Sequence, residues 1–256
     1  MLCLRGIEFR RACPYNSVTD ALLRLDHLAQ VLDRNMDDLQ FANSRKNMVD
    51  CQLRPNKVTD ERVLNAFGSI PREQFVPRSQ RAIAYVDEDL LLSGGRSMME
   101  PMVLSRLVQA LEVQAHHSVL VVGGSTGYAA AIMARLADSV ISIEARAQLV
   151  EKSQETLVAC GLDNAVAVKG RLTDGFAKEA PYQRILIEGS VEAVPNALLD
   201  QLSLDGLLAA VWRPSDHPVG VASLWSRSAG SFARKPLFDA QVPRLDEFRT
   251  KREFVF

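Results

Sequence analysis

The stretch 118–137 limits what this chain can fold into more than any other part of the sequence. It reads Ser-Val-Leu-Val-Val, then Gly-Gly-Ser-Thr-Gly, then an alanine-rich segment that begins at Tyr128. A continuous apolar run without polar alternation suits a strand that is buried on both faces of a parallel sheet. Glycines permit a sharp turn, and alanine favours helix. The order strand, glycine turn, helix predicts an α/β unit with a ligand site at the turn, where helix N–H groups are free.

The same alternation of strand and helix continues towards the C-terminus. Two further segments, 219–225 and 232–238, read as a closing antiparallel pair. Short strands separated by helices indicate a parallel sheet with helices on both faces. We therefore expect an α/β fold, a Rossmann-like, doubly wound, mainly parallel sheet with an antiparallel C-terminal edge. The expected strands are 118–122, 139–144, 165–168, 184–188 and 206–211, and the expected helices are 128–137, 148–160 and 194–202.

The residues before this sheet read as a helical region with loops. Thr59-Asp60 offers an N-cap for a helix that Ile70-Pro71 ends, and a loop at 87–101 precedes a helix at 102–113. Residues 21–39 carry enough leucines for one more helix. We expect three regions. They are an N-terminal extension at 1–47, a helical and substrate-loop region at 48–110, and the Rossmann-like domain at 111–256.

Composition excludes several classes of protein. The 256 residues are 47% hydrophobic and carry a net charge of −1, with no basic tract, so we expect no nucleic-acid or membrane partner. The four cysteines form no CxxC pair and have no histidine at metal-ligand spacing. We expect free thiols, no metal site and a cytoplasmic location.

A carboxylate follows the glycine turn at the end of the second strand, as Glu144. A carboxylate there can accept hydrogen bonds from both hydroxyls of a ribose, so a nucleoside ligand is expected. A dinucleotide requires glycine at the first, third and sixth turn positions, and here the third is Ser125 and the sixth is Tyr128. The turn therefore disfavours NAD.

Several further motifs in the sequence are typical of one family. They are Gln-Leu-Arg-Pro-Asn-Lys-Val-Thr-Asp at 52–60, Ile-Pro-Arg-Glu-Gln-Phe-Val-Pro at 70–77 and Ala-Tyr-Val-Asp-Glu at 84–88, with blocks at 180–185 and 194–202. Together with the turn and Glu144, they resemble the protein-L-isoaspartate O-methyltransferases, a class I S-adenosylmethionine-dependent family. The resemblance begins near Met48 and runs to the C-terminus.

The resemblance implies a reaction and a site. S-adenosylmethionine would donate a methyl group to an isoaspartyl carboxylate in damaged proteins or peptides. That carboxylate is ionised at pH 7 and needs no general base, so the protein has to align the reactants and exclude water. Ser97 takes the place of a family threonine hydroxyl and is the expected catalytic residue. The expected cofactor-binding residues are Gly123, Gly124, Ser125, Gly127, Tyr128, Glu144, Gly170 and Arg171.

This sequence departs from the family pattern at the expected site. The family loop usually reads Gly-Gln-Thr-Ile-Ser, and here it reads Gly-Arg-Ser-Met-Met at 95–99. Met99 thus replaces a serine by a thioether with no useful hydrogen-bond donor. Val121 replaces an acid, Ser125 a glycine, and Arg171 an aspartate that accepts from the adenine amino group. An arginine cannot accept that bond.

Two alternatives to the repair enzyme follow from these departures. One is a catalytically degenerate relative that serves as a binding module, and the other is a methyltransferase with another substrate. We expect residues 93–100 to lie over the mouth of the pocket and isoaspartyl methylation to be slow or absent. Arg96 and Arg171 are expected as surface charges, although both would favour an anionic ligand if they faced the pocket. Nothing in the sequence predicts the oligomeric state.

Overall fold

The computed structural model describes residues 36–229 and 231–250. Residues 43–256 form one compact unit, and residues 1–42 form another, of which the described part, 36–42, is helical. The helix expected at 21–39 therefore lies largely outside the described residues. The larger unit carries all of the predicted strands.

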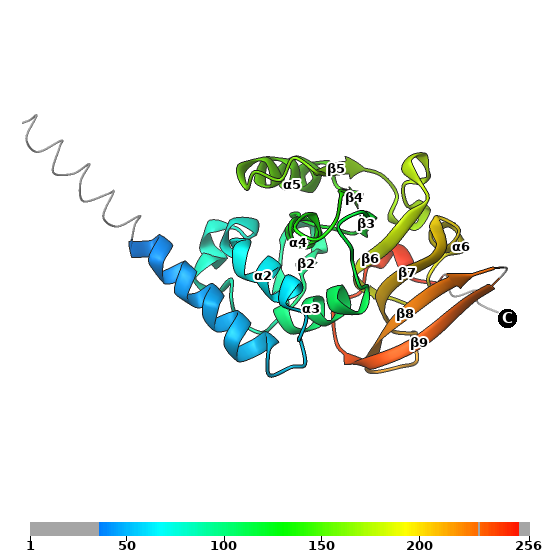
Figure 1. Ribbon diagram of the computed structural model, residues 1–256, viewed down its shortest axis with the longest axis horizontal. Helices are drawn as coiled ribbons and strands as arrows, with labels where there is room; N and C mark the ends of the chain where they lie inside the picture. The colour runs from blue at the N-terminus through cyan, green and yellow to red at the C-terminus, as the bar shows by residue number, and fades with distance from the viewer. Residues whose placement is uncertain (1–35, 230, 251–256) are drawn as a thin grey trace, which may run out of the picture. The chain divides into compact units, whose positions relative to one another are not determined.

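A seven-stranded sheet forms the centre of the larger unit (Figure 1). Its strand order is β5-β4-β3-β6-β7-β8-β9, with parallel pairing from β5 to β7 and antiparallel pairing of β8 with both neighbours. This confirms the Rossmann-like, mainly parallel fold with an antiparallel C-terminal edge. The strands are β3 (Ser118–Val122), β4 (Ser139–Glu144), β5 (Ala165–Lys169), β6 (Tyr182–Val191), β7 (Leu202–Trp212), β8 (Gly220–Ser228) and β9 (Ser231–Ala240).

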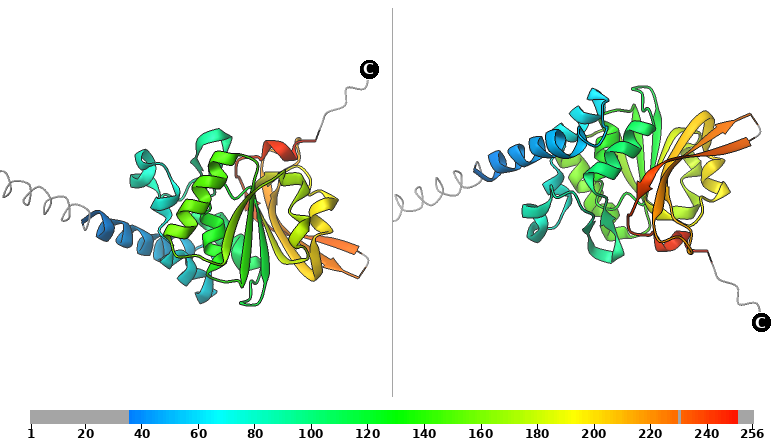
Figure 2. Two further views of the ribbon diagram at one scale, coloured as in Figure 1. Left: turned by 90° about the horizontal axis from the view of Figure 1, so that it is seen from above. Right: turned by 90° about the horizontal axis from the view of Figure 1, so that it is seen from below.

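Helices pack on both faces of this sheet (Figure 2). The Asp60 side chain accepts a hydrogen bond from the Arg62 N–H at 2.8 Å, so the predicted N-cap is confirmed. The helices are α2 (Glu61–Ser69), α3 (Pro101–Ala110), α4 (Tyr128–Ala134), α5 (Ala147–Ala159) and α6 (Asn196–Leu199). Shorter elements are η1 (Met48–Leu53), η2 (Arg72–Phe75), η3 (Arg78–Ile83), η4 (Ser93–Gly95), η5 (Leu172–Asp174), η6 (Ala177–Glu179), η7 (Asp246–Phe248), and a small hairpin of β1 (Leu90–Leu91) and β2 (Ser97–Met98).

Several expected elements differ in length from those observed; the strand expected at 206–211, for example, is β7, which already begins at Leu202. The helix expected at 194–202 is only α6, because the chain enters β7 at Leu202, which pairs with Tyr182 of β6. The strand expected at 184–188 extends over the whole of β6. Its Ser190 pairs with Val211 and also forms a parallel bridge with Arg244, and such distant partners leave no local pattern.

The carboxyl ends of β3, β4 and β6 meet at one edge of the sheet. The strand β3 lies between β4 and β6, so its two neighbours are reached by connections on opposite sides. Ligands of open α/β sheets bind in the crevice at such a switch point. Gly123 directly follows β3, Glu144 ends β4, and Glu188 lies in β6 just after Ile187, the last residue of β6 that pairs with β3.

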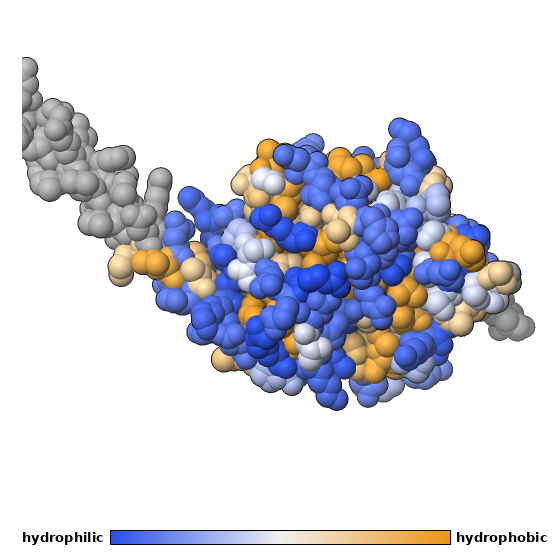
Figure 3. Space-filling view, in the orientation of Figure 1, coloured by the Kyte–Doolittle hydropathy of each residue, from blue (hydrophilic) through white to orange (hydrophobic). Residues whose placement is uncertain are grey.

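None of the helices in the described ranges is long and apolar enough to cross a membrane. On the face shown in Figure 3, hydrophilic residues dominate and hydrophobic residues form several separate groups. Scattered apolar groups of this kind are ordinary on a protein surface.

Candidate active site

The glycine turn after β3 has the compact shape that the sequence predicts. The Gly123 N–H donates to the Ile143 carbonyl at 2.9 Å, which brings the turn beside the end of β4. A side chain on Gly124 would place its Cβ 2.1 Å from the Ser142 Oγ. Gly127 precedes α4 with a φ of 97°, a left-handed conformation that favours glycine. The turn therefore needs these glycines for its own geometry.

Two side chains of the turn region face the N-terminal helical region. Thr126 donates from its hydroxyl to the Phe75 carbonyl at 2.6 Å. The Tyr128 ring makes edge-on contacts with Phe67 and Phe75, and the Arg72 guanidinium lies 4.7 Å from its centre. Burial raises the pKa of Tyr128 to about 12, so its hydroxyl is neutral. The Tyr128 side chain thus holds the turn in place, and its main chain is the part that lies at the helix start.

The carboxylate of Glu144 is already bound by another side chain. Arg96 donates to it from Nε at 2.8 Å and from Nη2 at 2.9 Å, a bidentate pair in which both side chains are 2% exposed. The N–H groups of Ala145 and Arg146 donate to the same carboxylate at 2.7 and 3.1 Å. Arg96 was expected at the surface, and that expectation is wrong, because the loop at 93–98 carries its side chain inward to the end of β4.

A second carboxylate binds the other edge of the same guanidinium. Glu247 accepts from Arg96 Nη1 at 3.0 Å and from Nη2 at 2.8 Å. Burial alone would lower the pKa of Arg96, but its bonds to Glu144 and Glu247 raise that pKa above the usual arginine value. Burial opposes ionisation of Glu247, yet the bond to Arg96 lowers its pKa overall. Arg96 therefore stays charged and links the loop at 93–98 to the C-terminal part of the chain.

The segment at 242–248, here called the closing segment, lies across the carboxyl ends of the strands. A Cβ built on Gly123 would be 3.2 Å from Leu245 Cδ1, and one built on Gly189 would be 2.7 Å from Leu245 Cγ. Leu245 thus rests directly on the two glycines that border the crevice. It is 5% exposed and belongs to the hydrophobic core.

Hydrogen bonds to β6 hold the closing segment. The Ser190 N–H donates to the Pro243 carbonyl at 2.9 Å, and the Leu245 N–H donates to the Ser190 carbonyl at 3.0 Å. The Ser190 hydroxyl adds a bond to the Val242 carbonyl at 3.0 Å. The closing segment therefore pairs with the end of β6 much as a short additional strand would.

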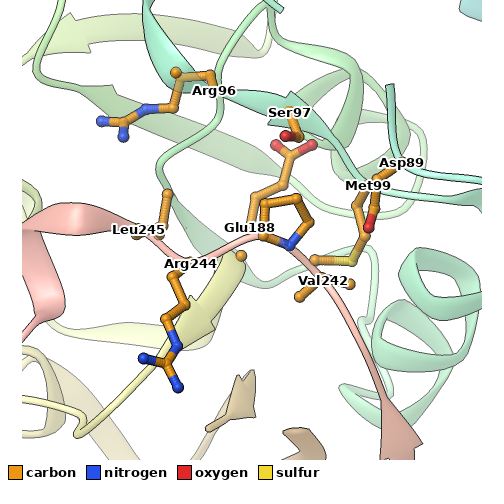
Figure 4. Close-up of a pocket in the computed structure, with 11 residues that line it drawn as sticks. Asp89, Arg96, Ser97, Met99, Glu188, Val242, Arg244 and Leu245 are labelled. Carbon is orange, nitrogen blue, oxygen red and sulfur yellow. The ribbon is translucent and has the colours of Figure 1, made fainter. Parts of the chain in front are cut away.

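A small cavity remains between the closing segment and the loop at 93–100 (Figure 4). Ser97 and Met99 line one side, and Val242 and Leu245 line another. The loop at 93–100 thus lies at the crevice, as expected. Figure 4 shows the carboxyl group of Glu188 turned towards the loop that carries Ser97. Among the described residues, neither Glu188 carboxyl oxygen nor the Ser97 hydroxyl has a hydrogen-bond partner.

Three acids near this cavity, the buried Glu188 and the half-buried Asp89 and Glu100, hold their protons more tightly than usual. Burial raises the pKa of Glu188 to about 8, against the attraction of Arg72. Burial also raises the pKa of Asp89 to about 6 and, together with neighbouring acids, that of Glu100 to about 7. Titratable groups with such shifts collect at functional sites, because catalysis needs a proton held near neutral pH. Glu188 is thus mostly neutral at pH 7.

The remaining expected cofactor residues lie at the end of β5. The Gly170 N–H donates to the Glu144 carbonyl at 3.0 Å, and a Cβ on Gly170 would be 2.6 Å from Ile143 Cδ1. The Arg171 side chain is 82% exposed and lies 3.6 Å from Asp174, so the expectation of a surface charge is confirmed for Arg171. Within the described ranges, no three potential ligand residues form a metal cluster.

Sequence reasoning missed two residues of this site. Glu188 is the last residue of the strand expected at 184–188, and its position at that carboxyl end could have marked it as a candidate. Glu247 gave no signal, because it meets Arg96 across 151 positions of the sequence.

The fold and the site together define a class I-type Rossmann-like methyltransferase. Two solved structures share the fold. One is a protein-L-isoaspartate O-methyltransferase with a TM-score of 0.69 and 23% identity, which covers 78% of this chain, while this chain spans 65% of it. The other, from Plasmodium falciparum, was solved with S-adenosyl-L-homocysteine and has a TM-score of 0.65 at 20% identity over 79% of this chain and 98% of its own.

Sequence comparison is more specific than the shared fold. The profile of the protein-L-isoaspartate(D-aspartate) O-methyltransferase family matches residues 43–217. A protein-L-isoaspartate O-methyltransferase of Koribacter versatilis is 35% identical over 82% of this chain and 90% of its own length. One from Methanoculleus marisnigri is 35% identical over 67% of this chain and 78% of its own. The chain belongs to the protein-L-isoaspartate O-methyltransferase family, whose members use S-adenosylmethionine.

Proposed function

We propose that this protein transfers a methyl group from S-adenosylmethionine to the carboxylate of isoaspartyl residues in damaged proteins or peptides. The observation that carries the proposal is the family match over residues 43–217. The glycine turn beside Glu144 supports it, since a buried acid next to such a turn suits a nucleoside with two ribose hydroxyls.

In this proposal, the position of each expected site residue in the fold indicates its role. Glu144 would accept from the ribose, and the main chain of 123–128 would lie along the rest of the cofactor. The main chain of Gly170 and Arg171 would border the adenine. Ser97, whose hydroxyl has no partner among the described residues, would donate to the isoaspartyl carboxylate.

The described residues do not fit the cofactor in the conformation of this structure. Arg96 holds the Glu144 oxygens that the ribose would need, and Leu245 rests on Gly123. The cavity volume is about 10 Å³, room for about one water molecule. Ligand sites for small molecules measure roughly 300–1,000 Å³. Both the loop at 93–98 and the closing segment would have to move before S-adenosylmethionine could bind.

Glu188 favours a second candidate, methyl transfer to a neutral hydroxyl or amine. A carboxylate nucleophile needs no base, whereas a neutral nucleophile must lose a proton during the reaction. Glu188 lies in the crevice without a partner among the described residues and has a pKa of about 8, near the pH at which a general base works best. In this candidate the nucleophile's proton would pass to the Glu188 carboxylate.

A tritiated-methyl transfer assay tests the two candidates. An isoaspartyl peptide is compared with the same peptide containing ordinary aspartate. Methylation of the isoaspartyl peptide alone supports the repair activity, and Glu188→Gln should then leave its rate nearly unchanged. Labelling of neither peptide, with S-adenosylmethionine bound, argues against the repair activity and favours another acceptor.

The cellular setting follows from the same proposal. Cys51 and Cys160 are free thiols in the described part of the chain, which suits a reducing compartment. We infer a cytoplasmic protein whose partners are damaged proteins or peptides, without a nucleic-acid or membrane partner. Fractionation of cells that express the full chain would test the location.

A further inference from the structure

We infer that two side chains of this protein fill its own cofactor site. The Arg96 guanidinium occupies the ribose position on Glu144, and Leu245 of the closing segment occupies the space above Gly123, so that the cofactor binds only when both are displaced. The inference rests on the cofactor class of the proposed function and not on its substrate.

The first step is competition for one carboxylate. Two oxygens of Glu144 accept four hydrogen bonds, two from Arg96 and two from backbone N–H groups. The direction open to a ribose is the one that Arg96 occupies, because the backbone N–H groups belong to the residues that follow Glu144 itself. A ribose pair and the Arg96 fork therefore exclude each other, and any cofactor must first break a buried bidentate bond.

The second step is occlusion of the turn. In the proposed complex the backbone at Gly123 would lie directly against the cofactor. In this structure the side chain nearest to that position is the apolar Leu245. The same leucine also covers Gly189 in β6, so it spans the crevice from β3 to β6. Glu247, two residues further on in η7, binds Arg96. The two obstacles are thus joined, and release of one weakens the other.

The third step is that both obstacles can leave without unfolding the sheet. The closing segment follows β9, the last strand of the sheet, and its hydrogen bonds go to Ser190, to Arg96 through Glu247, and to Glu192 and Pro214 through Arg244. Arg96 lies in a loop with Gly94 and Gly95 at φ values of 69° and 70°. Glycines in such a loop allow large changes of backbone angle at low cost. The sheet keeps its ladders when these two pieces move.

Calorimetric titration with S-adenosyl-L-homocysteine tests the inference on the full chain. Arg96→Gln should bind at least about tenfold more tightly than the native chain, which corresponds to about 1.4 kcal/mol. Leu245→Ala should bind more tightly as well, and it serves as the second variant if Arg96→Gln does not fold. Arg249→Gln is the matched control, because Arg249 is exposed, directly follows the closing segment and pairs with Asp246 of that segment. Its affinity should equal that of the native chain.

Hydrogen exchange gives a readout that needs no variant. Saturating S-adenosyl-L-homocysteine should speed exchange of the Leu245 amide, whose bond to Ser190 must break, and leave amides of β7 unchanged. Equal, tight binding by native chain and variants, with an unchanged Leu245 amide, would overturn the inference and leave the methyltransferase proposal standing. Absence of binding by every folded variant would overturn both, since Arg96 and Leu245 would then not be what excludes the ligand.

Discussion

Arg96 and Glu144 form a buried bidentate ion pair at 2.8 and 2.9 Å, at the end of β4, where we propose that the cofactor ribose binds. In the family loop the residue that matches Arg96 is usually a glutamine, a side chain that is shorter and carries no charge. The arginine at position 96 therefore brings a cation to Glu144, the last residue of β4, which lies 48 positions further along the sequence. The pair makes Glu144, the proposed ribose acceptor, part of the protein's internal structure.

The first prediction concerns the stability of this pair. Arg96→Gln should lower the free energy of unfolding by roughly 3 kcal/mol, the low end for breaking a buried ion pair, because Glu144 keeps two backbone N–H bonds. Urea denaturation measures the change. Arg249→Gln, at an exposed pair, should cost less than about 1 kcal/mol. Equal losses of unfolding free energy in the two variants would show that the burial of the Arg96 pair adds nothing to its stabilising effect.

The second prediction concerns the glycine turn. Gly127→Ala should be more destabilising than Gly161→Ala, although both glycines have positive φ values of 97° and 66°. A Cβ at Gly127 would lie 2.4 Å from the Ser153 Oγ, whereas one at Gly161 meets nothing within 4 Å. Gly161→Ala should cost about 1–2 kcal/mol, the penalty of the left-handed conformation alone. Thermal unfolding of the two variants would reveal no difference if the close approach were unimportant.

The third prediction concerns pH. The pKa of Glu188 rises from 4.5 to about 8 on folding, so the folded state binds more protons between these values. Its contribution to stability is full below about pH 4.5 and is lost as the pH rises towards 8. Asp89 and Glu100, with pKa values raised to about 6 and 7, act in the same direction at lower pH.

The variant Glu188→Gln isolates the contribution of Glu188 to this pH dependence of stability. The variant should be more stable than the native chain at pH 8, with a smaller difference at pH 5, because glutamine cannot ionise. Melting temperatures across pH 5–9 measure this. Parallel curves for the two proteins would contradict the assignment of this pH dependence to Glu188.

The central strands illustrate how much of the fold the sequence predicts. The ranges expected for β3 and β4 match those observed, because β3 is an almost continuous apolar run and β4 is rich in β-branched residues. Such strands can be recognised from their own residues, without knowledge of the neighbouring strand. The ends of β6 and the length of α6 could not be predicted in this way, because they depend on pairing with β7 and with the closing segment.

The site was predictable only in part, for a related reason. The glycine turn and Glu144 are read from one local unit, and the structure brings them together. Arg96 reads as an ordinary surface arginine, because nothing near it in sequence reveals an acid to pair with. Its partners lie 48 and 151 positions away, and only the fold brings all three together.

The fourth prediction concerns the N-terminal extension. Residues 43–256 form a compact unit of their own, and the family match begins at residue 43. Deletion of residues 1–35 should therefore leave the melting temperature of the remaining chain nearly unchanged. Differential scanning calorimetry of the two forms measures it. A drop of several degrees would show that the extension stabilises the core.

The last prediction concerns the loop at 95–99, where two changes bring back family residues. Arg96→Gln frees Glu144, and Met99→Ser replaces a buried thioether by a hydroxyl that can donate a hydrogen bond. The double variant should methylate an isoaspartyl peptide at least about tenfold faster than the native chain, since a hydrogen bond made in the transition state is worth more than about 1.4 kcal/mol.

Each single variant should gain less than the pair. In Met99→Ser the site remains closed by Arg96, and in Arg96→Gln the new opening still lacks the serine hydroxyl, so the two effects should not add. Arg249→Gln, directly after the closing segment and outside the site, should leave the rate unchanged. Rapid turnover by the native chain would contradict the prediction, because it would mean that neither Arg96 nor Met99 limits methyl transfer. A double variant no faster than Met99→Ser alone would restrict the effect to the missing hydroxyl.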